Sequence, residues 1–334
     1  MLGPIITSIP NTELSLNDRE LLKDPFIGGV ILFAENFIDK QQLKNLVQSI
    51  KEIKSPELLV FVDQEGGRIQ RFKNDFFRLP SHRDLGKVYD QNKDNGIRSA
   101  ELTGFIMAAE LLAEGVDLSF SPVVDIDYGI SRVISDRSFH SDPYAVSEMA
   151  KSFMKGMKDS GMKAVAKHFP GHGSVALDSH TDQPVDPRSF DEIEKDIKPY
   201  IELIANDLNG IMTAHIIYTS IDNKISTFSS KWLKEILREK LSYEGIIFSD
   251  DLTMQSAVEI GSMQDRINQS LHAGCDLILW CHPDESIKSI LSEFSDSLID
   301  KTATYEKIRP SIESIDQKEL DDRIEELTAL LNKK

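Results

Sequence analysis

Short apolar runs alternate with longer stretches of helical periodicity along most of the chain, and this alternation constrains the fold more than any other feature. Several of the runs are apolar at consecutive positions, which is typical of parallel strands buried on both faces. There are eight such runs: PIIT (4–7), GGVILF (28–33), LLVFVD (58–63), LSFSPVVD (118–125), MKAVAKH (162–168), GIMTAHI (210–216), GIIFSD (245–250) and DLILWC (276–281).

The stretches between these runs favour helices. Residues 40–51 carry apolar side chains three and four positions apart, as on one helical face. Further helices are expected over residues 97–114, 143–159, 191–206, 229–240 and 263–273, with Ser229 or Ser230 as the N-cap of the segment at 229–240. Eight strand–helix pairs predict an α/β fold, a single-domain (β/α)8 TIM-type barrel. An open doubly wound sheet is the alternative, but its pattern G-x-G-x-x-G is absent from the sequence.

The barrel is expected to occupy residues 1–284. The segment 285–334 contains the amphipathic pattern IEELTALL and is predicted to form a C-terminal helical extension packed on the outer or bottom face of the barrel. The longest predicted loops follow the third, fourth and fifth strands, at 64–96, 126–142 and 169–188. In a barrel these loops lie at the C-terminal ends of the strands, where active sites are built.

Charge and composition exclude several classes of function. The chain has 38 Lys and Arg against 55 Asp and Glu, a formal net charge of −17. A surface of this sign repels phosphate, so nucleic acid is not an expected partner. No apolar run approaches the roughly 18 residues of a membrane-spanning helix, and MLGPIITSIP lacks the regions of a signal peptide. Cys275 and Cys281 lie in apolar surroundings and should be reduced. We therefore expect a cytoplasmic protein without membrane contact.

Ionisable residues gather where several predicted strands end. Because parallel strands of a barrel end at one rim, these side chains should meet there, and several together are hard to explain as structural ion pairs. We therefore predict a functional site at this rim. Its members are Asp63 after the third strand, Lys167 and His168 after the fifth, His215 after the sixth, Asp250 and Asp251 after the seventh, and Arg71 and Arg137 in the following loops.

The segment KHFPGHGSVALDSHTD (167–182) predicts a loop with an acid/base group. Its glycines and proline prevent a helix, so His168 and His172 do not share a helical face as in an H-E-x-x-H metal site. Asp178 stands two residues before His180 and can accept the Nδ1–H of its ring. That hydrogen bond would fix the tautomer and raise the basicity of Nε2.

Two carboxylates close the seventh apolar run, GIIFSDD. Alternation along a strand sends neighbouring side chains to opposite sides, so one of Asp250 and Asp251 should face the rim. A carboxylate aimed at the anomeric carbon of a sugar serves as a nucleophile. We assign this role to Asp250 and a capping or supporting role to Asp251, although periodicity alone leaves their order open.

The segment VDQEGGRIQRF (62–72) offers sugar-binding groups. Asp63 can accept two sugar hydroxyls, and Arg71 can donate to several. The glycine pair at 66–67 permits a tight turn that brings the backbone close to a ligand. Glu65 and Arg68 either belong to the site or form a salt-bridged scaffold for the loop.

Together these motifs resemble those of glycoside hydrolase family 3. The similar segments are KHFPGH…DSH, DQEGGR…QRF, DRSFHSDP, MTAHI and IFSDDLTM, and the resemblance runs from GGVILFAENF to AGCDLIL. More narrowly, the chain looks like the single-domain bacterial β-N-acetylhexosaminidases of cell-wall recycling. The resemblance again implies a (β/α)8 barrel.

The resemblance implies a retaining reaction that removes terminal β-linked N-acetylglucosamine through a covalent glycosyl-enzyme, without cofactor or metal. By position in the motifs, Asp250 would be the nucleophile, and His180 paired with Asp178 the acid/base. The implied substrate is a small glycan, a muropeptide fragment containing N-acetylglucosaminyl-anhydro-N-acetylmuramic acid, with or without peptide. The implied substrate contacts are Asp63, Arg71, Arg137, Lys167 and His168.

Several alternatives remain open at the level of the sequence. Phosphate could intercept the same glycosyl-enzyme, which would make the protein a phosphorylase. A β-glucosidase of the family would usually carry a second domain that this chain is too short to hold. A metal-dependent amidohydrolase would usually show His-x-His on the first strand, which PIIT lacks. A sensor without catalysis, or a reaction assisted by the substrate's own acetamide, is the last alternative. A monomer is the default expectation.

Overall fold

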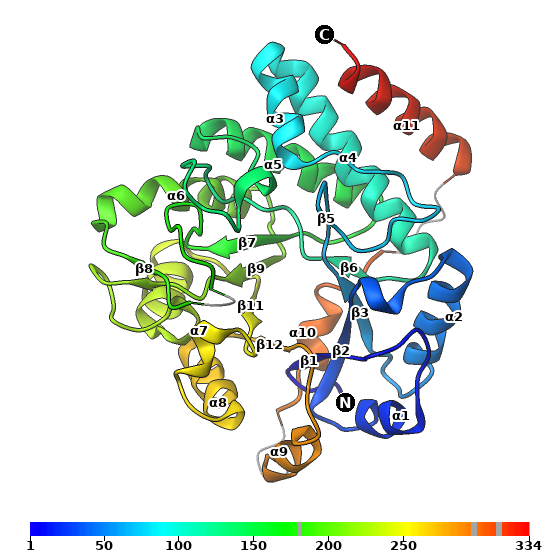
Figure 1. Ribbon diagram of the computed structural model, residues 1–334, viewed down its shortest axis with the longest axis vertical. Coiled ribbons are helices and arrows are strands. Elements are labelled where there is room, and N and C mark those ends of the chain that lie inside the picture. The colour runs from blue at the N-terminus through cyan, green and yellow to red at the C-terminus, as the bar shows by residue number, and fades with distance from the viewer. Residues whose placement is uncertain (180–181, 295–298, 312–315, 334) are drawn as a thin grey trace.

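A computed structural model describes residues 1–179, 182–294, 299–311 and 316–333. Its centre is an eight-stranded parallel sheet curled into a barrel, with helices around the outside (Figure 1). Each predicted apolar run contributes one strand, so the predicted barrel is confirmed. The strands are β1 (Ile5–Ser8), β2 (Ile27–Leu32), β3 (Leu59–Val62), β6 (Leu118–Ser119), β7 (Val165–Phe169), β9 (Gly210–Thr213), β11 (Ile246–Asp251) and β12 (Leu277–Trp280).

The barrel closes between its fourth and fifth strands by a few bonds rather than a full ladder. The strand order is β6-β3-β2-β1-β12-β11-β9-β7, and an isolated bridge joins Val123 to Lys167 across the seam. The amide of Val165 adds a 2.8 Å hydrogen bond to the Ser121 carbonyl. The sequence predicted a fourth strand over 118–125, which is too long. Pro122 within this run has no N–H to give to a ladder.

Helices follow most strands, and six of them correspond to the predicted ranges. These are α2 (Lys40–Lys51), α4 (Lys93–Ala113), α5 (Pro143–Asp159), α6 (Phe190–Ile204), the π-helical η4 (Lys231–Lys240) and α8 (Met263–Ala273). Of the two predicted N-cap serines of η4, Ser229 accepts the amide of Trp232 at 3.3 Å, whereas Ser230 makes no capping bond. Shorter elements are α1 (Leu16–Leu22), α3 (His82–Gln91), α7 (Gln255–Val258) and the 3-10 turns η1 (Ala34–Asn36), η2 (Ser135–Arg137) and η3 (Ser226–Phe228).

Two small strand pairs lie in the loops above the barrel. β4 (Gln64–Gly66) pairs antiparallel with β5 (Ile69–Gln70), and β8 (Val185–Asp186) pairs parallel with β10 (Ile217–Tyr218). They give backbone order to the loops after β3, β7 and β9, which carry much of the candidate site.

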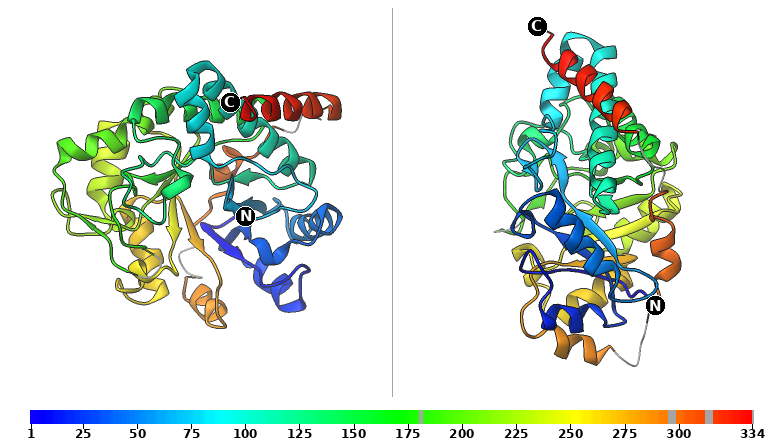
Figure 2. Two further views of the ribbon diagram at one scale, coloured as in Figure 1. Left: turned by 45° about the horizontal axis from the view of Figure 1, so that its top comes forward. Right: turned by 90° about the vertical axis from the view of Figure 1, so that its right-hand side faces the viewer.

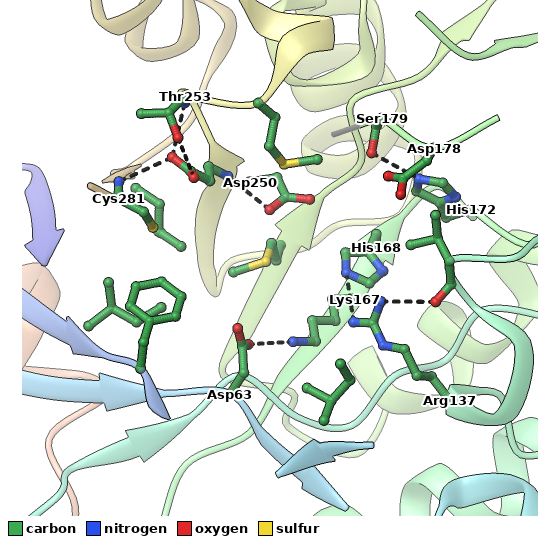
Figure 3. Close-up of a pocket in the computed structure, with 18 of the residues that line it drawn as sticks. Asp63, Arg137, Lys167, His168, His172, Asp178, Ser179, Asp250, Thr253 and Cys281 are labelled. Carbon is green, nitrogen blue, oxygen red and sulfur yellow. Dashed lines mark hydrogen bonds and ion pairs between the residues drawn. The ribbon is translucent and has the colours of Figure 1, made fainter. Parts of the chain in front are cut away.

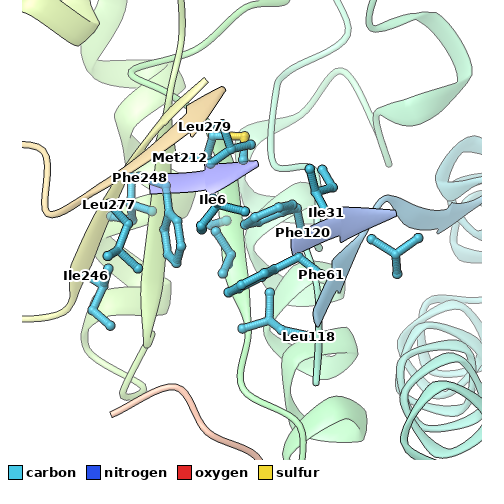
Figure 4. Packing of buried hydrophobic residues seen from close by; sticks show 14 of the residues in the cluster. Ile6, Ile31, Phe61, Leu118, Phe120, Met212, Ile246, Phe248, Leu277 and Leu279 are labelled. Carbon is cyan, nitrogen blue, oxygen red and sulfur yellow. The ribbon is translucent and has the colours of Figure 1, made fainter. Parts of the chain in front are cut away.

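Side chains fill the barrel interior, so it is a packed core and not a channel (Figure 4). Phe61 and Phe120 stack with ring centroids 5.3 Å apart, and Phe248 meets Phe120 edge to face at 5.4 Å. All three are fully buried. Aliphatic residues from facing strands, among them Ile6 and Leu279, surround these rings. The packed interior supports the strand ends as a rigid platform.

The described parts of the C-terminal segment pack on the barrel, and none of their residues lines the pocket described below. It contains α9 (Ile287–Glu293), α10 (Thr302–Glu306) and α11 (Gln317–Leu331). Tyr305 of α10 is buried beneath the barrel, with its ring 6.5 Å from that of Phe61. α11 runs alongside α4 (Figure 2), where Arg323 lies 3.7 Å from the ring centre of Phe105. The extension therefore packs on α4 at the outside and places Tyr305 beneath the barrel.

Candidate active site

A pocket of about 460 Å³ opens at the C-terminal ends of the strands (Figure 3). Its walls come from loops after most of the strands, as expected for a barrel active site. His180, the predicted acid/base, lies outside the described residues. The other residues predicted for catalysis or substrate binding line the pocket: Asp63, Arg71, Arg137, Lys167, His168, Asp178 and Asp250.

Matched charges form one side of the pocket. The Nζ of Lys167 lies 2.7 Å from Asp63 Oδ1 and 2.7 Å from Glu65 Oε1. Arg137 binds Glu65 with two hydrogen bonds of 2.8 Å. Burial alone would raise the pKa of Asp63, but Lys167 and Arg71 hold it below its usual value. Burial opposes ionisation of Glu65 too, yet Arg137 and Lys167 keep its pKa well below the ordinary value. Both acids are therefore ionised at neutral pH.

Two neighbouring side chains orient His168. Its Nδ1 lies 2.8 Å from Oδ2 of Asp125, whose side chain is wholly buried. A carboxylate at this position accepts the Nδ1–H, which leaves Nε2 as an acceptor. The guanidinium of Arg137 faces that atom at 3.4 Å. Asp125 and Arg137 thus fix the imidazole in one orientation at the pocket wall.

Arg71 keeps unused hydrogen-bonding capacity. Its closest acidic contact is Oδ2 of Asp63, at the long distance of 3.5 Å. None of the described residues accepts a hydrogen bond from its buried Nε. The guanidinium lies 5.6 Å from the ring centre of Phe33, which packs on His282 at 4.7 Å. Arg71 is therefore equipped to donate to a bound polar molecule.

Asp250 and Asp251 end β11 and line the pocket, and Asp250 lies on the side opposite Asp63 (Figure 3). The carboxylate of Asp251 accepts the amide of Thr253 at 3.0 Å and its hydroxyl at 2.6 Å, and also the Cys281 amide at 3.1 Å. Burial nevertheless raises the pKa of Asp251. The amide of Asp251 donates to Asp250 Oδ1 at 2.8 Å. Asp251 therefore makes several contacts within the protein, but both aspartates border the pocket, so the expectation that only one of them faces it is wrong.

The loop after β7 brings Asp178 to the pocket. Next to it, the Ser179 hydroxyl lies 3.2 Å from Nε2 of His172, and the Ser179 carbonyl accepts the Ser256 amide at 3.2 Å. Burial lowers the pKa of His172 to about 4, so this histidine is neutral at physiological pH. These contacts fix the described part of the loop against α7 and the end of β7.

The structure decides one open alternative and changes two predictions. Glu65 and Arg68 form a salt-bridged scaffold, with Arg68 2.9 Å from Asp136, and Arg68 also lines the pocket. The glycines at 66 and 67 have positive φ, so the tight turn is real, but added Cβ atoms would meet Pro80 and Ser81 rather than the pocket. His215, predicted at the rim, is buried between Thr227 and the Asp251 carbonyl and does not border the pocket.

Three contacts were not predicted from the sequence. Asp125 orients His168, Glu65 joins Arg137 to Lys167, and His172 contacts the Ser179 hydroxyl. Asp125 closes the fourth apolar run just as Asp63 closes the third, so the strand-end rule could have found it. Arg132, which also lines the pocket, carried no such signal.

Two further features are absent from the described residues. No group of three His, Cys, Asp or Glu side chains is arranged to hold a metal ion. No helix in this part of the chain has the length and apolar character needed to cross a bilayer.

Comparison with known proteins agrees with this geometry. Residues 7–315 match the model of the glycosyl hydrolase family 3 N-terminal domain. A β-hexosaminidase of Nitrosospira multiformis is 48% identical over 293 residues, which are 87% of this chain and 84% of that protein. A β-hexosaminidase of Methylobacillus flagellatus is 47% identical over 292 residues, 87% of this chain and 84% of that protein.

The fold comparison leads to the same family. The crystal structure of NagZ from Neisseria gonorrhoeae in complex with N-trifluoroacetyl-D-glucosamine has a TM-score of 0.91 and 37% identity, covering 99% of this chain and 98% of that one. The match extends over nearly the whole length of both proteins, including the helices after the barrel. The chain therefore belongs to glycosyl hydrolase family 3, and within it to the β-hexosaminidases.

Proposed function

We propose that the protein is a retaining exo-β-N-acetylglucosaminidase that removes the terminal sugar of peptidoglycan fragments. The observation that carries this proposal is the placement of Asp250 across one pocket from the paired Asp63 and Lys167. A sugar held by its hydroxyls on the charged side would present its anomeric carbon to the carboxylate opposite. Retention then follows from two successive displacements at that carbon.

In the first displacement, Asp250 attacks the anomeric carbon, the bond to the leaving oxygen breaks, and that oxygen takes a proton from His180. In the second, water attacks the same carbon, gives its proton to His180, and releases Asp250. Asp178 would orient the imidazole. This histidine is a cation when it donates the proton and neutral when it accepts one, so in neither state does it repel the anionic nucleophile as a second carboxylate would.

Hydroxyl recognition would fall to the charged side of the pocket. Asp63 can accept from sugar hydroxyls, while Lys167 and Arg71 can donate to them. Because these charges already neutralise one another, they act as oriented dipoles that need no rearrangement when substrate binds. His168 and Arg137 would complete the contacts, and no cofactor is proposed.

The proposed substrate class follows from the cations at the pocket. Five lysine and arginine side chains line it in a chain with a net charge of −17: Arg68, Arg71, Arg132, Arg137 and Lys167. Arg132 is exposed, and none of the described residues forms a hydrogen bond or ion pair with its side chain. A fragment that carries carboxylates, such as a muropeptide, would supply the missing partner.

The test is turnover of 4-nitrophenyl β-N-acetylglucosaminide beside the matching β-glucoside, with and without chelator. We expect hydrolysis of the N-acetyl compound that chelator does not change. Asp250→Ala should lose at least about a thousandfold in kcat because the covalent route is removed. Asp159→Ala, a change at a surface acid on the far end of α5, is the matched control and should be silent.

Three outcomes would overturn parts of the proposal. A 2-fluoro sugar that labels no residue, together with an active Asp250→Ala variant, would exclude Asp250 as nucleophile. Formation of sugar 1-phosphate in phosphate buffer would make the protein a phosphorylase. If well-folded protein turns over neither sugar, the protein would instead be a non-catalytic sensor of amino sugars.

A further inference from the structure

Arg188 lies just beyond the loop that carries Asp178, and all three of its guanidinium nitrogens are engaged. Its Nε and one terminal nitrogen bind Asp186, the latter at 2.7 Å. The same terminal nitrogen donates to Ser174 Oγ at 2.7 Å. The other lies 2.8 Å from Asp196 Oδ2 and 3.2 Å from the Tyr128 hydroxyl. A single planar group thus joins four separate segments of chain.

Two of those segments are the opposite ends of one loop. Ser174 lies soon after β7, and Asp186 belongs to β8. The Ser174 hydroxyl also donates directly to Asp186 Oδ2 at 2.6 Å. The span between them carries Asp178 and Ser179 to the active site. Arg188 and these two partners therefore close the base of this loop.

The other two segments fix the closed base to the barrel. Asp196 lies on α6, and Tyr128 lies in the loop after β6. The backbone of Gly171, at the start of the loop, packs directly on Asp196, and its carbonyl accepts the Tyr218 hydroxyl at 2.6 Å. The loop base is thus tied to three neighbouring strand–helix units.

The buried cluster around Arg188 contains two carboxyl groups and one cation. Asp186 and Asp196 are each 1% exposed, and Arg188 is the cation that contacts both. Burial raises the pKa of Asp196 to about 7 in spite of this contact. Ion pairs of this kind add little to stability relative to apolar packing. At the base of the loop, these ion pairs instead fix the relative positions of the segments that they join.

We propose that Arg188 is a positioning residue, which holds the base of the loop closed so that Asp178 stays in register with the pocket. It does not line the pocket in the part of the chain that the structure describes, so it acts through the loop and not on the sugar. This inference rests on the proposed acid/base role of the Asp178–His180 pair.

The test uses the dependence of rate on the leaving group. An acid/base that is out of register slows the departure of a poor leaving group, but an acidic phenol departs without protonation. Arg188→Lys keeps the charge and loses the planar fork. We expect kcat/KM to fall about tenfold or more for an alkyl or sugar leaving group, and less than about threefold for 2,4-dinitrophenolate.

Azide supplies a second readout. This anion attacks the glycosyl-enzyme without a general base, so it should restore kcat of the variant on the dinitrophenyl substrate and give glycosyl azide. Ser174→Ala removes one contact of the loop base, keeps the ion pairs, and should show the same pattern more weakly. The Ser174→Ala variant therefore tests the inference even if Arg188→Lys does not fold.

Matched controls separate position from stability. Arg238→Lys alters a similar arginine, which binds Asp276 and two carbonyls at the opposite end of the barrel. Ser220→Ala removes a hydroxyl that donates to the Arg188 carbonyl outside the loop. Both should leave the leaving-group dependence unchanged.

Equal losses on all substrates, or folded Arg188→Lys with wild-type behaviour, would overturn the inference. Failure of the proposed function would instead appear as an active Asp250→Ala variant.

Discussion

Arg132 differs from the other cations of the pocket. Arg137 and Lys167 share Glu65, and Arg68 is paired with Asp136, so these charges are already matched. Arg132 lines the same pocket and is exposed, and none of the described residues pairs with it. An unpaired cation at a binding site attracts an anionic group of the ligand more than a matched pair does.

We therefore expect Arg132→Gln to change selectivity rather than chemistry. KM should rise about fivefold for a substrate whose leaving group bears a carboxylate, because an exposed ion pair contributes up to about 1 kcal/mol. KM for the nitrophenyl substrate should be unchanged. Arg78→Gln, at an exposed arginine that does not border the pocket, is the control. Equal KM values of wild type and Arg132→Gln on the acidic substrate would refute this role.

At the scale of the element, the crossing of α4 and α5 depends on two glycines. A Cβ at Gly104 would lie 2.1 Å from the Phe153 carbonyl oxygen, and one at Gly156 would lie 2.0 Å from that of Glu101. Both obstacles are backbone atoms, which cannot rotate away. The two helices approach closely because neither glycine has a side chain at the contact.

This geometry reverses the usual effect of Gly→Ala in a helix. Alanine in a helix interior normally stabilises by about 1 kcal/mol. We expect Gly156→Ala to destabilise by about 1–3 kcal/mol instead, because the helices must move apart. Urea denaturation gives the free energy of unfolding, and Ser152→Ala on the half-buried part of α5 should change it little. A more stable Gly156→Ala variant would contradict the close packing.

Local patterns predicted the elements well where burial alone decides them. The run GIIFSDD predicted both β11 and the polar residues at its end, and the strand-end rule brought Asp63, Lys167 and Asp250 to one pocket. The same rule placed His215 at the rim, but Thr227 and a carbonyl satisfy its ring inside the protein. Which group a polar side chain contacts depends on how segments of the chain approach one another in space, and the periodicity of one segment does not contain this information.

The same limit explains what the sequence analysis did not find. Glu65 bridges Arg137 and Lys167, which come from two other loops or strands, 72 and 102 positions away in the sequence (137 − 65 and 167 − 65). Arg188 joins segments around 128, 174, 186 and 196, none of which is marked by a pattern of its own. Such networks become visible only when the barrel brings the segments together.

At the scale of the whole molecule, buried histidines should make stability depend on pH. His82 is buried against the Phe139 ring and donates its Nδ1–H to the Arg137 carbonyl at 2.8 Å. Burial lowers its pKa from 6.5 to about 4. Between these pH values the unfolded chain binds a proton that the folded protein does not. Stability from this group is therefore complete above pH 6.5 and is lost as the pH falls toward 4.

The variant His82→Asn keeps a donor for the Arg137 carbonyl but does not titrate. The free energy of unfolding of the wild type should therefore fall more steeply from pH 6.5 to pH 4.5 than that of the variant, by up to about 1.4 kcal/mol per pH unit. Asp196, whose raised pKa acts in the opposite direction, is present in both proteins and cancels in the difference. Parallel slopes in denaturation at several pH values would show that His82 titrates normally.

The two native thiols have a practical consequence. Cys275 and Cys281 are 3% and 2% exposed, and burial raises the pKa of both, so neither forms appreciable thiolate at neutral pH. Leu177, beside Asp178, is 49% exposed. The substitution Leu177→Cys would thus add the one fast-reacting thiol of the chain. A fluorophore or spin label could be attached there without removing a native cysteine, which makes the loop directly accessible to spectroscopy.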